Sequence, residues 1–243
     1  MLTRHHIMLA LLCSLIIGSV TFRFDPLLIV ALSAGTVVGV VLPDIHMKKP
    51  KMSGLKTIAW YIVHIGILLC IPVIHWIYKV FPGLYIRPDD KRLTHSLPGI
   101  AVYFIIFAGL SSIPLILFRE NIPGRLVLVI LGGILSGLFL HLIEDLCTMK
   151  GIQVLFPFNE TIIRGSVRPC NIDDTRILQF HYQHASILGI LISLQFVIMS
   201  DVLLTICGFF AVFLCIGYMV WRSDVRVIFP EYRHSDPREA VPA

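Results

Sequence analysis

Charged residues are scarce in this sequence. Asp, Glu, Lys and Arg make up 14% of the 243 residues, whereas a soluble globular domain has about 25%. Hydrophobic residues make up 56%, and the mean hydropathy is +0.85. This composition excludes an ordinary soluble domain and predicts an integral membrane protein. The length suits one membrane domain that covers residues 1–243.

Several motifs of known chemistry are also missing. The sequence has no Gly-x-Ser-x-Gly elbow, no phosphate-binding glycine-rich loop and no dinucleotide fingerprint, so serine-nucleophile and nucleotide chemistry have little support. Its six cysteines contain no Cys-x-x-Cys pair, which argues against a disulfide framework and a cysteine zinc site. The net charge of +5 fits the basic cytoplasmic loops of a membrane protein, and no nucleic-acid partner is expected.

Long apolar segments are what the sequence has instead. A membrane-spanning helix needs about 20 apolar residues, and its backbone must be hydrogen-bonded within the segment. The segments that approach this length are Ile7–Phe22, Pro26–Leu42, Thr57–Val80, Leu97–Phe118, Leu126–Leu146, Ala185–Met199 and Val202–Trp221. The third differs from the others, because Pro72 interrupts it and Trp and Tyr lie near its ends. It could span the membrane, re-enter it or lie in the interface.

The positive charges choose between these topologies. If residues 57–80 do not cross, only Arg23, Arg119 and Arg125 of the 20 basic residues lie on the outer side. If they do cross, the basic residues are divided much more evenly, against the positive-inside rule. The sequence therefore predicts an all-α bundle of about six transmembrane helices, with residues 57–80 re-entrant or interfacial. Both termini and a loop over residues 147–183 are then cytoplasmic.

Four polar clusters interrupt the apolar background. They are Leu42–His46, Asp89–Ser96, His141–Asp145 and His181–His184. With six crossings all four lie at the same membrane face, whereas with seven crossings Asp44 lies opposite the others. The topology that satisfies the charges therefore also assembles a polar site.

The clusters offer ligands for a metal ion. His141 and Asp145 are spaced i, i+4, which puts both on one face of a helix about 6 Å apart along the axis. Imidazole and carboxylate groups suit Zn, Mn or Fe. Plainer readings remain open at this point. The pair could be a polar cap on the bundle, His95 could accompany a helix cap, and Asp44 could be a solvated end of a helix.

These clusters resemble the YdjM-like family of inner-membrane proteins, which are described as metal-dependent hydrolases. The matching stretches are Leu42-Pro43-Asp44-Ile45, Thr94-His95-Ser96, and His141 with Asp145, Thr148, Gly151, Pro157 and Phe158. His46 stands where the family has a second aspartate, and Asp90 where it has a histidine, so each exchange keeps a possible ligand. The family's N-terminal histidine matches His6 best. The resemblance covers His5 to Phe158 and leaves the C-terminal hairpin unexplained.

The resemblance implies a hydrolase of the inner membrane that uses a divalent metal ion, either Zn, Mn or Fe. The implied metal ligands are Asp44, His95, His141 and Asp145, with His46, Asp90 and His6 as further candidates. Glu144, beside the ligand pair, is the candidate general base. A site at the cytoplasmic membrane face suits a lipid or a lipid-linked phosphoester as substrate. The alternatives are an ion or small-molecule transporter, and a metal-bound membrane protein with a regulatory partner.

Overall fold

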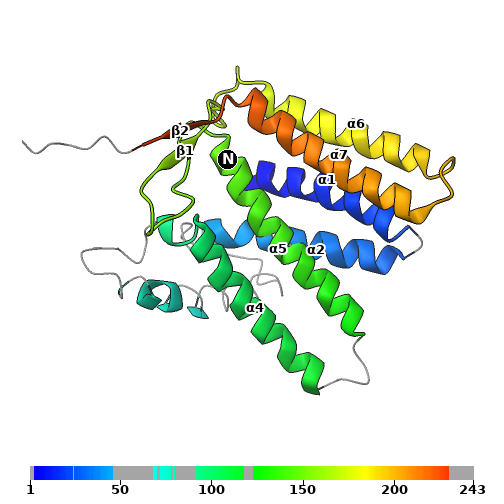
Figure 1. Cartoon of the computed structure of the whole chain (residues 1–243), viewed down its shortest axis with the longest axis horizontal. Helices are drawn as coiled ribbons and strands as arrows, with labels where there is room; N and C mark the ends of the chain where they lie inside the picture. Colours follow the sequence, from blue (N-terminus) through cyan, green and yellow to red (C-terminus); the bar gives the residue numbers. More distant parts are fainter. Residues whose placement is uncertain are drawn as a thin grey trace, which may run out of the picture.

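Three antiparallel helical hairpins form the bundle (Figure 1). The computed structural model describes residues 3–23, 25–45, 68–69, 72–77, 79, 91–117 and 123–229. The hairpins pair α1 (Thr3–Thr21) with α2 (Pro26–Ile45), α4 (Leu97–Leu117) with α5 (Gly124–Leu146), and α6 (Arg176–Leu194) with α7 (Asp201–Arg222). A short 3-10 helix, η1 (Lys91–Leu93), precedes α4. The last turn of the first helix and the first turn of the second helix of each hairpin lie at one end of the bundle, and the start of α1 and the end of α7 lie at the other (Figure 1).

Four of the described helices are long and apolar enough to cross a membrane: Thr3–Thr21, Pro26–Asp44, Gly124–Leu146 and Asp201–Arg222. α4 contains the apolar stretch Leu97–Leu110. Large apolar side chains such as Leu128, Phe210 and Phe213 are exposed on the outside of these helices, as expected where lipid is the solvent. A helical membrane protein is therefore confirmed.

The C-terminal hairpin differs from the prediction at its first helix. Apolarity predicted a segment over 185–199, but α6 runs over Arg176–Leu194. The first half of α6 carries Gln179, His181 and Gln183, so a search for apolar runs passes over it. The connection after α5, predicted to extend to residue 183, therefore ends at residue 175. We call residues 147–175 the cap loop.

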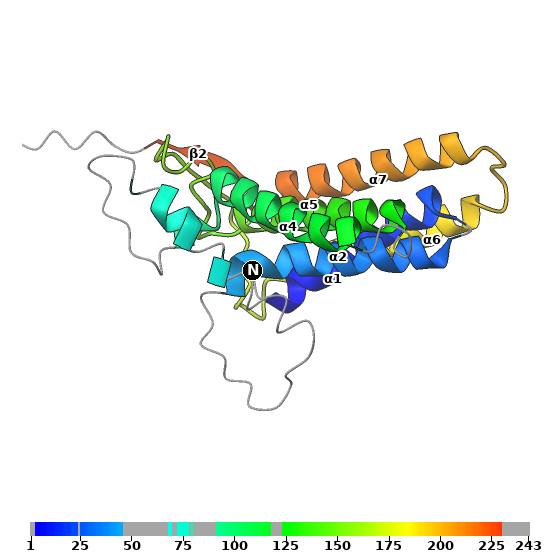
Figure 2. The ribbon, with the colours of Figure 1, turned by 90° about the horizontal axis from the view of Figure 1, so that it is seen from below.

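Two short strands were not predicted and depart from a purely α-helical fold. β1 (Ile162–Arg164) lies in the cap loop and pairs antiparallel with β2 (Arg226–Ile228), with Ile163 opposite Val227. Strands of three residues are too short to give an alternating sequence pattern. The pair joins the cap loop to the chain after α7, at one end of the bundle (Figure 2).

Glycines bring α2 and α5 into very close contact. Gly35 and Gly39 on α2 face Gly133 and Gly137 on α5, each pair four residues apart. An added Cβ would lie 2.9 Å from Thr36 N at Gly133 and 2.7 Å from Val40 N at Gly137. Small residues at this spacing let the backbones of membrane helices approach. The last turns of α2 and α5, which carry two of the polar clusters, are thereby held against each other.

More than half of the segment 57–80 lies outside the described residues. Of it, residues 68–69, 72–77 and 79 are helical. The re-entrant or interfacial placement of this segment therefore stays a prediction.

Candidate metal centre

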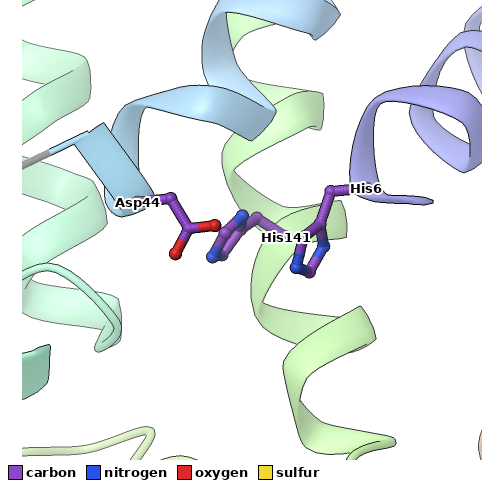
Figure 3. Close-up of side chains that lie close together, drawn as sticks. All are labelled: His6, Asp44 and His141. Carbon is purple, nitrogen blue, oxygen red and sulfur yellow. The ribbon is translucent and has the colours of Figure 1, made fainter. Parts of the chain in front are cut away.

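Five candidate ligands from four separate segments converge at one end of the bundle. His6 lies at the start of α1, Asp44 at the end of α2, His95 between η1 and α4, and His141 and Asp145 near the end of α5. Figure 3 shows His141 between Asp44 and His6. The exposed fractions are 0% for His141, 1% for His6, 3% for His95 and 8% for Asp44. These polar groups are therefore almost completely removed from solvent.

A backbone carbonyl fixes the orientation of His141. Its Nδ1 atom lies 2.7 Å from the carbonyl oxygen of Val40, one turn before Asp44 on α2. Because a carbonyl oxygen can only accept, Nδ1 carries the hydrogen and Nε2 presents a lone pair. This hydrogen bond needs the close approach of α2 and α5 that the glycines provide.

His95 is oriented in the same way. Its Nδ1 atom lies 3.1 Å from Lys91 O and 3.0 Å from Thr94 Oγ1, which leaves Nε2 as the free nitrogen. Thr94 Oγ1 donates to Pro43 O at 3.1 Å and so ties this turn to the end of α2. Ser96 Oγ accepts from Gly99 N at 3.3 Å and caps α4. Ser96 therefore caps α4 while its neighbour His95 is the candidate ligand, so the two roles predicted for this segment are compatible.

The free imidazole nitrogens face carboxylate oxygens at distances that suit a shared cation. His95 Nε2 lies 3.5 Å from Asp44 Oδ1 and 3.6 Å from Asp145 Oδ2, and His141 Nε2 lies 3.7 Å from Asp145 Oδ2. Neither nitrogen forms a hydrogen bond with any residue that the structure describes. Atoms bound to a tetrahedral zinc ion at about 2.0–2.2 Å lie about 3.3–3.6 Å apart. Lone pairs that face carboxylates in a buried site need a proton or a metal ion between them.

The donors form two overlapping sets. One is His95, His141 and Asp145, and the other is His6, Asp44 and His141, with the ligand atoms of each set within 4.8 Å of one another. Both sets use His141, which has only one free nitrogen. The cluster is therefore best described as one centre. His95, His141 and Asp145 are its main donors, and His6 and Asp44 lie beside them.

Glu144 lies behind the centre, against α1. Its Oε2 atom is 2.6 Å from His6 Nδ1, and the residue is 0% exposed. His6 Nε2 then points to Asp145 Oδ1 at 3.4 Å. Metal-binding histidines commonly donate their second nitrogen to such a carboxylate, which fixes the ring. This position fits the orientation of His6 better than the predicted role of a general base, because Glu144 faces α1 and not the cavity.

An open cavity of about 510 Å³ lies over the centre. Asp44, His95 and Asp145 line it from the bundle, and residues of the cap loop line it as well. The basic residues among its lining are Lys91, Arg92, Lys150 and Arg168. Ligand pockets commonly have volumes of about 300–1,000 Å³. Of the cap-loop residues in this lining, Thr148 and Gly151 belong to the motif that follows Asp145, whereas Lys150 and Arg168 belong to no motif and were not predicted.

Comparison with known families agrees with the motifs that surround this centre. A family model described as YdjM inner membrane protein matches residues 1–223. The chain belongs to the YdjM inner membrane protein family. The match continues through α6 and α7, so the C-terminal hairpin that the motif resemblance left unexplained is part of what the YdjM family shares. No curated protein and no solved structure matches this chain.

Two candidate ligands lie outside the described residues, and the His181–His184 cluster stands apart from the centre. His46 and Asp90, the two exchanges relative to the YdjM motifs, lie outside the described residues. His184 Nδ1 bonds to Phe180 O at 2.7 Å, and His181 stacks on His5 with ring centroids 5.6 Å apart. Neither belongs to the ligand sets found among the described residues.

Polar contacts anchor the cap loop over the cavity. Arg176, the first residue of α6, donates to Asp174 Oδ2 at 2.6 Å and to Ser166 O at 2.8 Å. Ser166 N in turn donates to Ser223 O, after α7, at 2.7 Å. The hydrogen bonds from Arg176 lower the pKa of Asp174 to about 2. The cap loop is therefore tied to both helices of the C-terminal hairpin.

Proposed function

We propose that this protein is a membrane-bound, metal-dependent hydrolase. The observation that carries the proposal is the convergence of two buried imidazole lone pairs and two carboxylates at 3.5–3.7 Å beneath an open cavity. Catalytic zinc sites use three protein ligands and leave a position for water. His95, His141 and Asp145 supply such a set, and the same donors suit Mn or Fe.

The surrounding residues have separable roles in this proposal. When bound, a divalent ion lowers the pKa of a coordinated water and polarises the scissile bond. Asp44 lines the cavity and is the carboxylate placed to take a proton from the attacking water. Lys91 Nζ lies 3.9 Å from Asp44 Oδ1 and forms an ion pair with it. Glu144 holds His6, whose Nε2 supports Asp145.

The proposal includes six crossings with both termini in the cytoplasm. The three hairpins bring the start of α1 and the end of α7 to the same end of the bundle (Figure 1). The basic lining residues Lys91, Arg92, Lys150 and Arg168 lie there as well. The positive-inside rule places such an end at the cytoplasmic face. A lipid or a lipid-linked phosphoester could reach a site at that depth from the inner leaflet.

Metal content tests the proposal directly. Elemental analysis of detergent-purified protein should find Zn, Mn or Fe near one ion per chain in the wild type. His141→Ala and Asp145→Ala should lose most of it. His184→Ala is the matched control, because His184 is also buried and also bonds a backbone carbonyl through Nδ1. If the wild-type protein holds no metal after gentle purification, and binds none on reconstitution, the proposed metal-dependent hydrolase function is refuted.

A further inference from the structure

The cavity over the metal centre carries more positive than negative side chains. Its lining includes two Lys and two Arg side chains, against the carboxylates of Asp44 and Asp145. A divalent ion at the proposed centre would balance both carboxylates. Lys91 already lies 3.9 Å from Asp44 Oδ1. Lys150 and Arg168 would then have no counter-charge in the lining, and this favours an anionic ligand.

Two of these cations have unused binding capacity. Lys150 forms no hydrogen bond or ion pair with the residues that the structure describes. Arg168 Nε donates to Met149 Sδ at 2.9 Å, and within the same described ranges its Nη groups have no acceptor. The guanidinium therefore keeps the pair of donors that binds an oxyanion in a fork.

The cations come from two segments of the chain that both line the cavity. Lys91 and Arg92 belong to η1, beside the ligand His95, and the Arg92 guanidinium lies 4.6 Å above the Phe156 ring. Arg168 is fixed through its backbone N, which donates to Asp174 Oδ2 at 2.8 Å. An anion bound by Lys150 and Arg168 would share this cavity with Asp44, His95 and Asp145 of the metal centre.

We propose that Lys150 and Arg168 form a phosphate-binding subsite in this cavity, and that the substrates are phosphate esters. The catalytic part of this proposal rests on the proposed hydrolase. Peptide and glycosidic bonds carry no charge, so their binding would leave Lys150 and Arg168 without a counter-charge in the cavity. A carboxylate offers two oxygens and one charge, whereas a phosphate offers more acceptors and matches arginine donors in pairs.

The reaction balances without a further reagent. The oxygen of water forms a bond to phosphorus while the bond between phosphorus and the leaving alcohol oxygen breaks. One proton of the water passes to Asp44 and then to the leaving oxygen, and the other remains on the phosphate. Lys150 and Arg168 hold the non-bridging oxygens, where negative charge accumulates.

Binding of inorganic phosphate tests the subsite. Isothermal titration of the full chain in detergent, with and without added metal, would compare the wild type with Lys150→Gln/Arg168→Gln. The double variant should bind phosphate at least about tenfold more weakly, since each charge-assisted contact is lost. Arg164→Gln is the matched control: Arg164 is an exposed arginine of the same loop that does not line the cavity, and its loss should leave affinity unchanged.

The outcomes separate this inference from the proposed hydrolase. Phosphate binding that depends on Lys150 and Arg168 in metal-free protein supports the subsite even if no metal is ever found. Equal phosphate affinity in the wild type and the double variant overturns the subsite, even with metal bound. The subsite is also overturned if acetate displaces bound phosphate as effectively as added phosphate does. With metal bound, turnover of phosphatidic acid in vesicles alone would assign a lipid ester. Turnover of 4-nitrophenyl phosphate as well would assign soluble esters too.

Discussion

Gly137 is the residue where a single methyl group should disturb the metal centre from a distance. In Gly137→Ala the new Cβ would lie 2.7 Å from Val40 N and would overlap Thr36 O. Unbonded heavy atoms prefer about 3.5 Å or more, so α2 and α5 must separate by roughly 1 Å. Overpacking of this kind costs about 1–3 kcal/mol. We expect a lower midpoint of thermal unfolding in detergent.

The same displacement acts on the ligand geometry. Val40 O accepts the hydrogen bond from His141 Nδ1 at 2.7 Å, and a shift of roughly 1 Å would break it. Loss of a partner that orients a metal ligand lowers metal affinity by about 10–100-fold. Competition with a chromogenic chelator would measure that affinity.

Gly132→Ala is the control, because it makes the same chemical change on the same helix where nothing lies within 4 Å of the new Cβ. It should leave both the unfolding midpoint and the metal affinity near wild type. The reasoning fails if Gly137→Ala behaves like Gly132→Ala in both assays. If Gly137→Ala lowers stability and leaves metal affinity intact, the glycine contact supports the bundle but does not position His141.

Two further variants test the residues around the centre. Glu144→Gln keeps the shape of the side chain but weakens its hold on His6 Nδ1, so metal affinity should fall about tenfold; an unchanged affinity in the chelator assay would contradict the orienting role. Asp174→Asn should speed hydrogen exchange in the cap loop at neutral pH, whereas Asp224→Asn, which removes an exposed pair with Arg226, should not. The folded pKa of Asp174 is about 2, below the usual value of about 3.9. Its stabilisation is therefore present above pH 4 and is lost as the pH falls towards 2, and equal exchange in wild type and Asp174→Asn at pH 6 would refute it.

Properties that depend on single side chains, or on residues close together along the chain, could be predicted from the sequence. The scarcity of charge determined the membrane class, because the transfer of each side chain into lipid depends mainly on that side chain. The spacing of His141 and Asp145 placed both on one face of α5, since the helical rise is fixed. The motifs also indicated Asp44, His95 and His6. In contrast, the three-residue strands and the polar start of α6 gave no periodic signal long enough to detect.

The geometry of the centre was decided only by the tertiary structure. Contacts between helices depend on where their axes cross, and here the glycines of α2 and α5 set that crossing. The crossing brings Val40 O to His141 and so selects the nitrogen that faces the carboxylates. It is also the packing of α1 against α5 that turns Glu144 towards His6. The cap loop adds Lys150 and Arg168 to the cavity through contacts far apart in the chain, which no local pattern encodes.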